Sequence, residues 1–171
     1  MAKIAIISDT HNNQKLLRKS LENESELDYI FHLGDYYDDL NNNYDLLKSR
    51  ILIQVPGIYH QGYAEGTLPK KMEITIENWK FLLVHDIKDA KRSLAKNQII
   101  LYGHSHLPAF KRFESKLYLN PGHLKRAKDR GNDASYCLAE LNKNEIQFYF
   151  KNPDGEIIKQ YNVIRQELED K

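Results

Sequence analysis

The sequence predicts a single α/β domain, and two observations support this fold class. Short apolar runs rich in Ile, Val, Phe and Leu alternate with longer amphipathic stretches in the first half, which is typical of strand–helix–strand units around a largely parallel sheet. Further along, short strand-like runs follow one another directly. No repeat, low-complexity tract or linker divides the 171 residues, so we assign 1–171 to one domain, which is long enough to bury a sizeable core.

The first half contains three predicted strands separated by two predicted helices. The strands are continuous apolar runs, as expected for buried strands of a parallel sheet. Leu16, Leu17 and Leu21 recur at helical spacing and predict the first helix. The elements are, in order, a strand at 3–8, a helix at 12–24, a strand at 29–33, a helix at 38–49 and a strand at 50–55.

The second half is predicted to be mostly strands. Two pairs of strands are separated by short polar turns and are expected to form hairpins, one at 72–84 and one at 136–151. A further turn, Asn152-Pro153-Asp154-Gly155, precedes the last strand. The predicted strands are 72–76, 80–84, 98–102, 110–113, 116–119, 136–141, 145–151 and 156–163.

Composition excludes several classes of protein. The 25 Lys and Arg balance 24 Asp and Glu, a net charge of +1, whereas a dedicated binder of duplex nucleic acid needs a net basic face. The one cysteine, Cys137, lies in an apolar run, so we expect a buried thiol and a reducing compartment. No segment resembles a membrane span or a secretory signal, and we therefore expect a cytoplasmic protein that does not bind membranes.

The histidines carry the functional information. All seven precede residue 124, and most lie at or just after a predicted strand. Because ligands bind beyond the carboxyl ends of strands in open α/β sheets, residues that follow different strands converge there. The residues at these positions that can bind a metal are Asp9, His11, Asp35, His60, His85, Asp86, His104 and His106.

The spacing of these residues also fits metal binding. Asp9 and His11, like His104 and His106, are two residues apart, so in an extended segment each pair would point the same way. Asp35 follows a glycine that allows a sharp turn, and its two oxygens can bridge two cations. Imidazole and carboxylate ligands together suit Mn, Fe, Zn, Co or Ni.

One such motif alone is a weak signal, but the set together predicts a metal site. His32 differs from the other histidines, because it lies within a strand between Phe31 and Leu33. We expect it to be a hydrogen-bonded core residue or to support the ligands from behind.

The series Asp-x-His, Gly-Asp, Gly-x-x-x, His-x and Gly-His-x-His, in this order, resembles the calcineurin-like metallophosphoesterases. The similarity is strongest to their small, capless bacterial and archaeal phosphodiesterase branch. It runs from residue 3 to about residue 150 and includes the turn Asn120-Pro121-Gly122. The resemblance implies a four-layer α/β/β/α sandwich, in which two mixed sheets lie face to face, helices flank them and a dinuclear centre lies at one edge.

The resemblance also implies a ligand set and a chemistry. One metal would be held by Asp9, His11 and His106 and the other by His85 and His104, with Asp35 between the two. Asp35, His85 and His104 are the residues expected to carry catalysis, the histidines as ligands and not as general bases. The cofactors would be two divalent transition metals, Mn first, with Fe, Ni, Co or Zn as alternatives.

Three positions depart from the pattern of this family. Ile58 occupies the position of a ligand asparagine, His85-Asp86-Ile87 replaces His-Gly-His, and His123 replaces a serine. One explanation is that His60, which we favour, or Asp86 supplies the missing donor. The other is that the second metal is weakly held or absent, as in the retromer subunit of this fold, which serves as a protein-binding scaffold.

The leading hypothesis is a metal-dependent phosphodiesterase, with activity weakened by the lost ligand. It would hydrolyse a small or nucleotide-like phosphodiester by attack of a metal-bridging hydroxide. The alternatives are a catalytically weak scaffold for a partner protein and a mononuclear metalloprotein. Two further features bear on the substrate. The basic run 125–130 could reach substrate phosphates, but we interpret it as a solvated charge run. The loop tyrosines would stack a base or pack the rim, namely Tyr36, Tyr37, Tyr59 and Tyr63.

Overall fold

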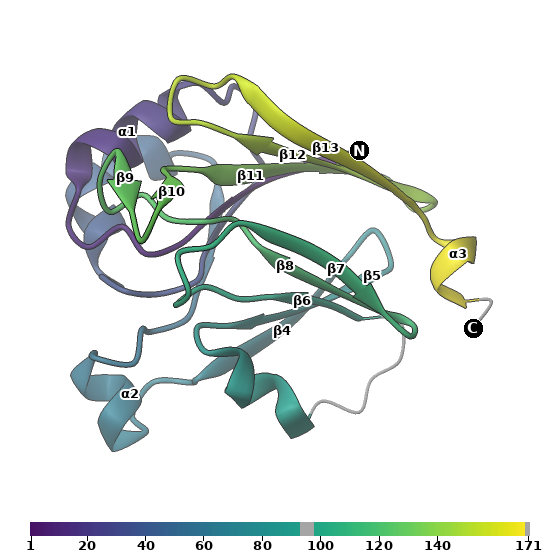
Figure 1. Cartoon of the computed structure of the whole chain (residues 1–171), viewed down its shortest axis with the longest axis horizontal. Helices are drawn as coiled ribbons and strands as arrows, with labels where there is room; N and C mark the ends of the chain where they lie inside the picture. The colour runs from purple at the N-terminus through teal and green to yellow at the C-terminus, as the bar shows by residue number, and fades with distance from the viewer. Residues whose placement is uncertain (93–97, 170–171) are drawn as a thin grey trace.

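In the computed structural model, which describes residues 1–92 and 98–169, the strands form two mixed sheets that lie one above the other (Figure 1). The first sheet has the order β13-β12-β11-β1-β2-β3. Its strands β1, β2 and β3 are parallel, and its other pairs are antiparallel. Their bounds are β1 Ala2–Ile7, β2 Tyr29–His32, β3 Ile51–Gln54, β11 Tyr136–Leu141, β12 Glu145–Lys151 and β13 Ile157–Ile164.

The second sheet has the order β4-β5-β6-β8-β7. Strands β5, β6 and β8 are parallel, and an antiparallel strand lies at each edge. The β4–β5 hairpin turns at Glu77 and Asn78, which both have positive φ, as the favoured two-residue hairpin turn requires. The bounds are β4 Lys71–Ile76, β5 Trp79–Val84, β6 Gln98–Leu101, β7 Ala109–Phe113 and β8 Lys116–Asn120.

Helices cover the outer face of each sheet. Leu17 of α1 (Gln14–Glu22) and Leu40 of the 3₁₀ helix η1 (Asp39–Leu47) pack in one cluster with Ile30 of the first sheet. On the second sheet the outer layer is thin, with Ala90 of the short 3₁₀ helix η2 (Ile87–Arg92) against Leu82. The predicted four-layer sandwich is therefore confirmed. Across residues 1–92 and 98–169, no helix is long and apolar enough to cross a membrane.

The main core lies between the two sheets. Phe31 of the first sheet contacts Phe81 of the second edge to face, with their ring centres 5.8 Å apart. Cys137 is a free, fully buried thiol in the same cluster, as its apolar surroundings predicted, and burial raises its pKa.

The helix expected at 38–49 is not an α-helix. Its residues form η1, which is kinked at Asn43, where φ is −126° and ψ is 42°. The Asn43 side chain donates to the Asp39 carbonyl (3.1 Å) and also bonds Gln14, and such side-chain bonds compete with a regular helix. Short elements that the sequence did not predict are α2 Gln61–Glu65, η2, β9 Lys128–Asp129, β10 Asn132–Asp133 and α3 Gln166–Glu169.

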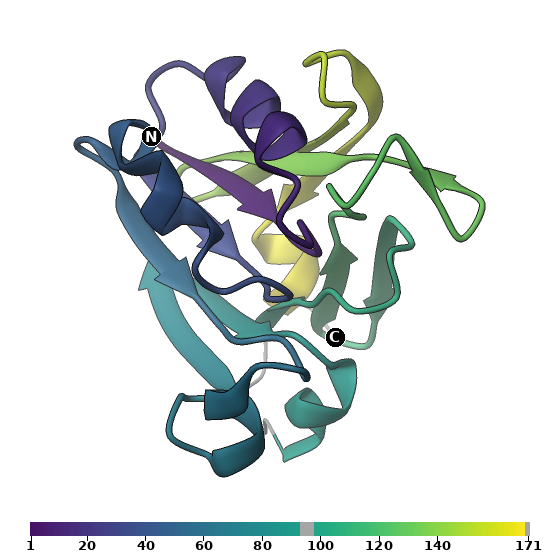
Figure 2. The same ribbon diagram turned by 90° about the vertical axis from the view of Figure 1, so that its left-hand side faces the viewer.

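The carboxyl ends of β1, β2, β3, β5 and β6 gather at one end of the sandwich, which Figure 2 views directly. Backbone hydrogen bonds tie the loops there together within each sheet. The Asp9 N–H donates to the Gly34 carbonyl, and the Gly103 N–H donates to the His85 carbonyl, both at 3.0 Å. The predicted metal-binding residues therefore emerge from a rigid edge shared by both sheets.

His32 supports this edge from within β2, and it gives the fold a pH dependence. Its Nδ1 accepts a hydrogen bond from the Gly34 N–H (3.1 Å), and burial lowers its pKa from 6.5 to about 4. Between these two values the unfolded chain binds a proton on His32 and the folded chain does not. The free energy of unfolding should therefore fall as the pH is lowered from 6.5 to 4.

We expect His32→Leu to flatten this part of the pH profile in the metal-free protein. The difference should reach roughly 1–3 kcal/mol, since one pKa unit corresponds to about 1.4 kcal/mol. Urea unfolding of both proteins across this pH range measures it. Parallel curves for the variant and the unaltered protein would show that other groups carry the acid sensitivity.

Candidate metal centre

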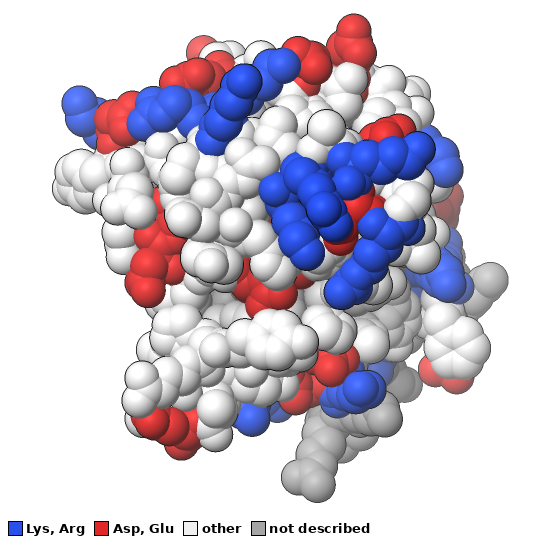
Figure 3. Space-filling view, turned by 60° about the vertical axis from the view of Figure 1, so that its left-hand side comes forward, with Lys and Arg blue, Asp and Glu red and all other residues white. Residues whose placement is uncertain are grey.

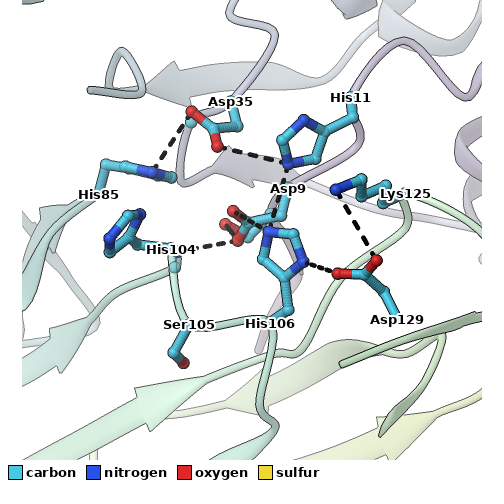
Figure 4. Close-up of polar contacts among 12 residues, drawn as sticks. Asp9, His11, Asp35, His85, His104, Ser105, His106, Lys125 and Asp129 are labelled. Carbon is cyan, nitrogen blue, oxygen red and sulfur yellow. Dashed lines mark hydrogen bonds and ion pairs between the residues drawn. The ribbon is translucent and has the colours of Figure 1, made fainter. Parts of the chain in front are cut away.

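Four donor atoms converge at the edge shared by the two sheets. They come from the loop after β1 (Asp9, His11), the loop after β2 (Asp35) and the loop after β6 (His106), as Figure 4 shows. His106 Nε2 lies 3.2 Å from His11 Nε2 and 3.2 Å from Asp9 Oδ1. All four donors lie within 4.8 Å of one another. Two imidazoles and two carboxylates in this arrangement suit a divalent transition metal.

The Asp35 carboxylate also reaches a second group of donors. Its Oδ2 is 3.4 Å from His11 Nε2, and its Oδ1 is 3.4 Å from His85 Nε2 on the other side. The His104 ring lies next to His85, with their ring centres 5.3 Å apart. The structure thus brings together all six residues that the sequence proposed as ligands, and Asp35 lies between the two groups.

Two buried atoms at this site are left free to bind a cation. His85 Nδ1–H donates to the Leu33 carbonyl (2.7 Å), which leaves the Nε2 lone pair directed toward Asp35. Neither His85 Nε2 nor Asp9 Oδ1 has a hydrogen-bond partner within the described part of the chain. Buried polar atoms are normally paired, so these two atoms fit a site whose partner is a metal ion.

Neighbouring groups hold Asp9 in its ionised form. Its other oxygen, Oδ2, accepts hydrogen bonds from Ser8 Oγ (2.6 Å) and from the His104 N–H (3.0 Å). Burial by itself would raise the pKa of Asp9, but contacts with His106, His85 and Ser8 outweigh it, and the pKa lies below its ordinary value. Asp9 is therefore an anion prepared to bind a cation.

The two histidines near the free Asp9 oxygen have opposite pKa shifts. Burial lowers the pKa of His11, so its ring is neutral and offers a lone pair. Burial acts in the same direction on His106, but the nearby Asp9 carboxylate (3.2 Å) and the hydrogen bond to Asp129 outweigh it and raise its pKa. A cation at this site would therefore compete with a proton for the Nε2 of His106.

The expectation that His104 and His106 point the same way is wrong. The segment is not extended, because φ is +65° at His104 and +61° at His106. As a result His106 faces Asp9 and His11, while His104 faces His85. Positive φ is uncommon and costly outside glycine, yet the same backbone region is adopted by five of the six proposed ligands, namely Asp9, His11, Asp35, His104 and His106.

Two glycines allow the close approach of the backbone to this site. A Cβ at Gly57 would lie 1.9 Å from Asp35 Oδ1, and a Cβ at Gly34, where φ is +98°, would lie 2.7 Å from His85 Nδ1. Any side chain at either position would displace a proposed ligand. Both glycines are therefore required by the geometry of the site.

The residues considered as substitutes for the missing asparagine have other partners. His60 caps α2, where its Nδ1 accepts from the Gly62 N–H (3.0 Å) and its Nε2 lies 3.9 Å from Asp38. Asp86 accepts from the Lys88 N–H (2.9 Å) and pairs with the Lys88 ammonium (3.6 Å). Ile58 is half-buried in the loop after β3. Neither proposed substitute belongs to the cluster of four convergent donors, which does not include His85 or His104 either.

Asp129 is a functional residue that sequence reasoning missed. It lies in the basic run 125–130, yet it is buried, and its Oδ2 accepts from His106 Nδ1–H (2.6 Å). The Arg126 guanidinium bonds its other oxygen, and these contacts place the pKa of Asp129 below its ordinary value. The interpretation of this run as wholly solvated is therefore wrong. The β9–β10 hairpin, turned at Arg130 and Gly131 with positive φ, directs Asp129 inward.

The turn at Asn120-Pro121-Gly122 supports the loop of His104 and His106. The Asn120 amide donates to the Gly103 carbonyl (2.9 Å) and to Ser105 Oγ (3.0 Å). His123 donates from Nε2 to the Asn132 carbonyl (3.1 Å), and its ring centre lies 5.4 Å from that of His106. His123 therefore packs behind a proposed ligand.

We expect Asp129→Asn to weaken metal binding, because an amide oxygen is a poorer acceptor for the His106 N–H. Loss of such a supporting carboxylate typically lowers metal affinity by about 10–100-fold. Titration of the metal-free protein with Mn measures the effect. Asp133→Asn, an exposed position on the same hairpin, is the matched control. Equal affinity for both variants would show that Asp129 does not position His106.

The chain is similar to known proteins. Residues 2–144 match the calcineurin-like phosphoesterase superfamily domain. The chain is 27% identical over 158 residues to the probable metallophosphoesterase MG207 of Mycoplasma genitalium, covering 85% of this chain and 91% of that protein. It is 24% identical over 141 residues to the phosphodiesterase MJ0936 of Methanocaldococcus jannaschii, covering 70% and 82%.

A solved structure has a similar fold. Wild-type Vps29 of Entamoeba histolytica, complexed with zinc, superposes with a TM-score of 0.68 at 25% identity, covering 95% of this chain and 99% of that one. The family match spans most of the chain and includes every proposed ligand. The chain belongs to the calcineurin-like phosphoesterase superfamily.

Proposed function

We propose that this protein is a metal-dependent phosphodiesterase that hydrolyses a small or nucleotide-like phosphodiester. The observation that carries the proposal is the position of Asp35, whose two oxygens face two groups of metal-competent side chains. The superfamily match and the relative named as a phosphodiesterase support it. A cytoplasmic location remains a prediction, with which the free thiol of Cys137 agrees.

Two divalent ions would be held by the donors described above. Asp9, His11, Asp35 and His106 would hold one, while Asp35, His85 and His104 would hold the other. Mn is our first expectation, and Fe, Ni, Co and Zn suit the same donors. When bound, the ions supply Lewis acidity to the phosphate oxygens and lower the pKa of a water molecule.

Neighbouring groups fix the orientation of the side chains that would bind the ions. Ser8 and the His104 N–H fix one oxygen of Asp9, so the other oxygen points into the site. The Leu33 carbonyl fixes the His85 ring, and Asp129 fixes the His106 ring. Positions set in this way before the substrate arrives lower the cost of reorganisation during the reaction.

Ile58 favours a second candidate function. The family resemblance implies a ligand asparagine at this position, and isoleucine has no donor atom, so the second group has fewer side-chain ligands than the first. A weakly held second ion would make the protein a mononuclear metalloprotein, and loss of both ions would leave a catalytically weak scaffold for a partner protein. Metal content separates the three: after incubation with Mn, two ions per chain support the proposal, one supports a mononuclear protein and none supports a scaffold.

We expect hydrolysis of bis(p-nitrophenyl) phosphate to require added Mn and to stop when a strong chelator is present. Asp35→Ala should remove more metal than His11→Ala, because Asp35 faces both groups of donors. Elemental analysis of the purified variants measures this difference. The control is Asp154→Ala, in an exposed turn where the aspartate pairs with surface Lys19. Full metal content in both site variants, or activity that survives the chelator, would contradict the assignment.

The second prediction for this site concerns Ile58→Asn. Because His60 and Asp86 both have other partners, the new amide oxygen should strengthen the second ion's binding by about 10-fold and increase the hydrolysis rate. Ile58→Leu, which adds no donor, is the matched control. An unchanged or reduced rate in Ile58→Asn would indicate that His60 or Asp86 already fills the position. His60→Ala would then distinguish these two residues.

A further inference from the structure

A cavity of about 530 Å³ opens beside the metal centre, within the range of small-ligand sites. His11 and Asp35 form the wall that it shares with the metal centre. The opposite walls come from the loops after β2 and β3. A phosphodiester held at the metal centre would therefore extend one of its two ester groups into this cavity.

The lining of the cavity is aromatic and acidic. Tyr36, Tyr37 and Tyr59 contribute rings, and Tyr59 is 84% exposed. Asp38 adds an exposed carboxylate, whereas Asp39 is buried and its oxygens accept from Thr10 and Gln14. Among the described lining residues there is no Lys or Arg. The tyrosines suit the flat face of a base, and the Asp38 carboxylate suits amino and hydroxyl donors. The same carboxylate would repel a second phosphate group.

The other flank of the metal centre is basic. Lys125 Nζ and the Arg130 guanidinium both lie within 4 Å of Asp129, and Arg126 bonds it. Arg130 also donates to the His104 carbonyl (3.0 Å), which places its charge against the loop of proposed ligands. Lys125 lies beside His11 in Figure 4, and Figure 3 shows Lys and Arg side chains gathered on this face. One carboxylate cannot balance three cations, so the flank stays positive.

The two flanks therefore differ in the charge that they accept. We propose that the preferred substrate is a short nucleotide chain, with its terminal nucleoside in the cavity lined by Tyr36, Tyr37 and Tyr59 and its next phosphate on the basic flank formed by Lys125, Arg126 and Arg130. This inference rests on the proposed phosphodiesterase activity. Water adds to the scissile phosphorus, one P–O ester bond breaks and the leaving alkoxide takes a proton from that water, so the chain is shortened by one terminal unit.

Four dinucleotides test the proposal: ApA, pApA, ApAp and pApAp, which differ only in their terminal phosphates. We expect one of the singly phosphorylated compounds to be hydrolysed with a kcat/KM about five-fold above that of ApA, the effect of one exposed charge pair. Whether pApA or ApAp is preferred shows which end of the nucleotide chain, 5′ or 3′, lies on the basic flank. The doubly phosphorylated compound should lose this advantage, because its second phosphate enters the acidic cavity. Added salt should reduce the preference.

Variants of the basic flank and of the cavity test which residues produce this preference. Lys125→Gln should bring the preferred compound and ApA to within about two-fold through a higher KM, while Arg126 still holds Asp129. Lys80→Glu is the control, since it is exposed at the end of β5 remote from His85 and should leave the preference intact. Tyr59→Ala should raise the KM of all four dinucleotides, because a base loses its stacking partner.

A parallel assay with bis(p-nitrophenyl) phosphate distinguishes failure of this inference from failure of the proposed function. If the aryl diester is hydrolysed but terminal phosphates change nothing, or the doubly phosphorylated compound is best, the inference is wrong and the phosphodiesterase proposal stands. If Mn supports hydrolysis of none of these compounds, the proposed function fails and the inference fails with it.

Discussion

The site depends on the close approach of three backbone segments around one carboxylate. Asp35 lies where the loops after β2 and β3 touch, and Gly57 is packed so tightly against it that a Cβ would overlap Oδ1. On the other side His85, from the second sheet, is held by the Leu33 carbonyl of the first. Asp35 can face both groups of donors only because the two sheets, packed through contacts such as Phe31 against Phe81, end at the same edge. The core between the sheets thus sets the spacing of the site.

The same core explains how the energetically unfavourable backbone conformation of the proposed ligands is maintained. Five of the six proposed ligands have positive φ, a conformation that costs of order 1–3 kcal/mol per residue when strained. Hydrogen bonds between loops, such as Asp9 N–H to the Gly34 carbonyl, hold these residues in place, and each loop follows a buried strand. Positive φ also occurs at turn residues such as Glu77 and Asn78, but at the five proposed ligands it turns the donor atoms toward a common site.

Much of the fold and of the donor set could be predicted from the sequence, because strand patterns and the order of the motifs are local signals. The strands at 136–141 and 145–151 have their predicted bounds. The direction of His104 relative to His106 could not be predicted, since it depends on two left-handed residues held by Asn120 and Asp9 from distant segments. Asp129 was missed for a related reason: its neighbours in sequence are basic and exposed, and only the β9–β10 turn shows that it faces His106.

The two groups of donors are unequal, and this inequality has an energetic consequence. Asp9 Oδ1 and His85 Nε2 are buried without hydrogen-bond partners in the described chain, and each such atom costs the metal-free fold roughly 1–3 kcal/mol. An ion bound by either atom removes that cost and stabilises the folded state by mass action. The first group has four convergent donors for this purpose, whereas the second has Asp35, His85 and His104, and isoleucine stands at position 58, where the family resemblance implies a ligand asparagine. Metal binding at Asp9 should therefore contribute most of the stabilisation, and the chemistry that needs both ions depends on what occupies the position next to His85.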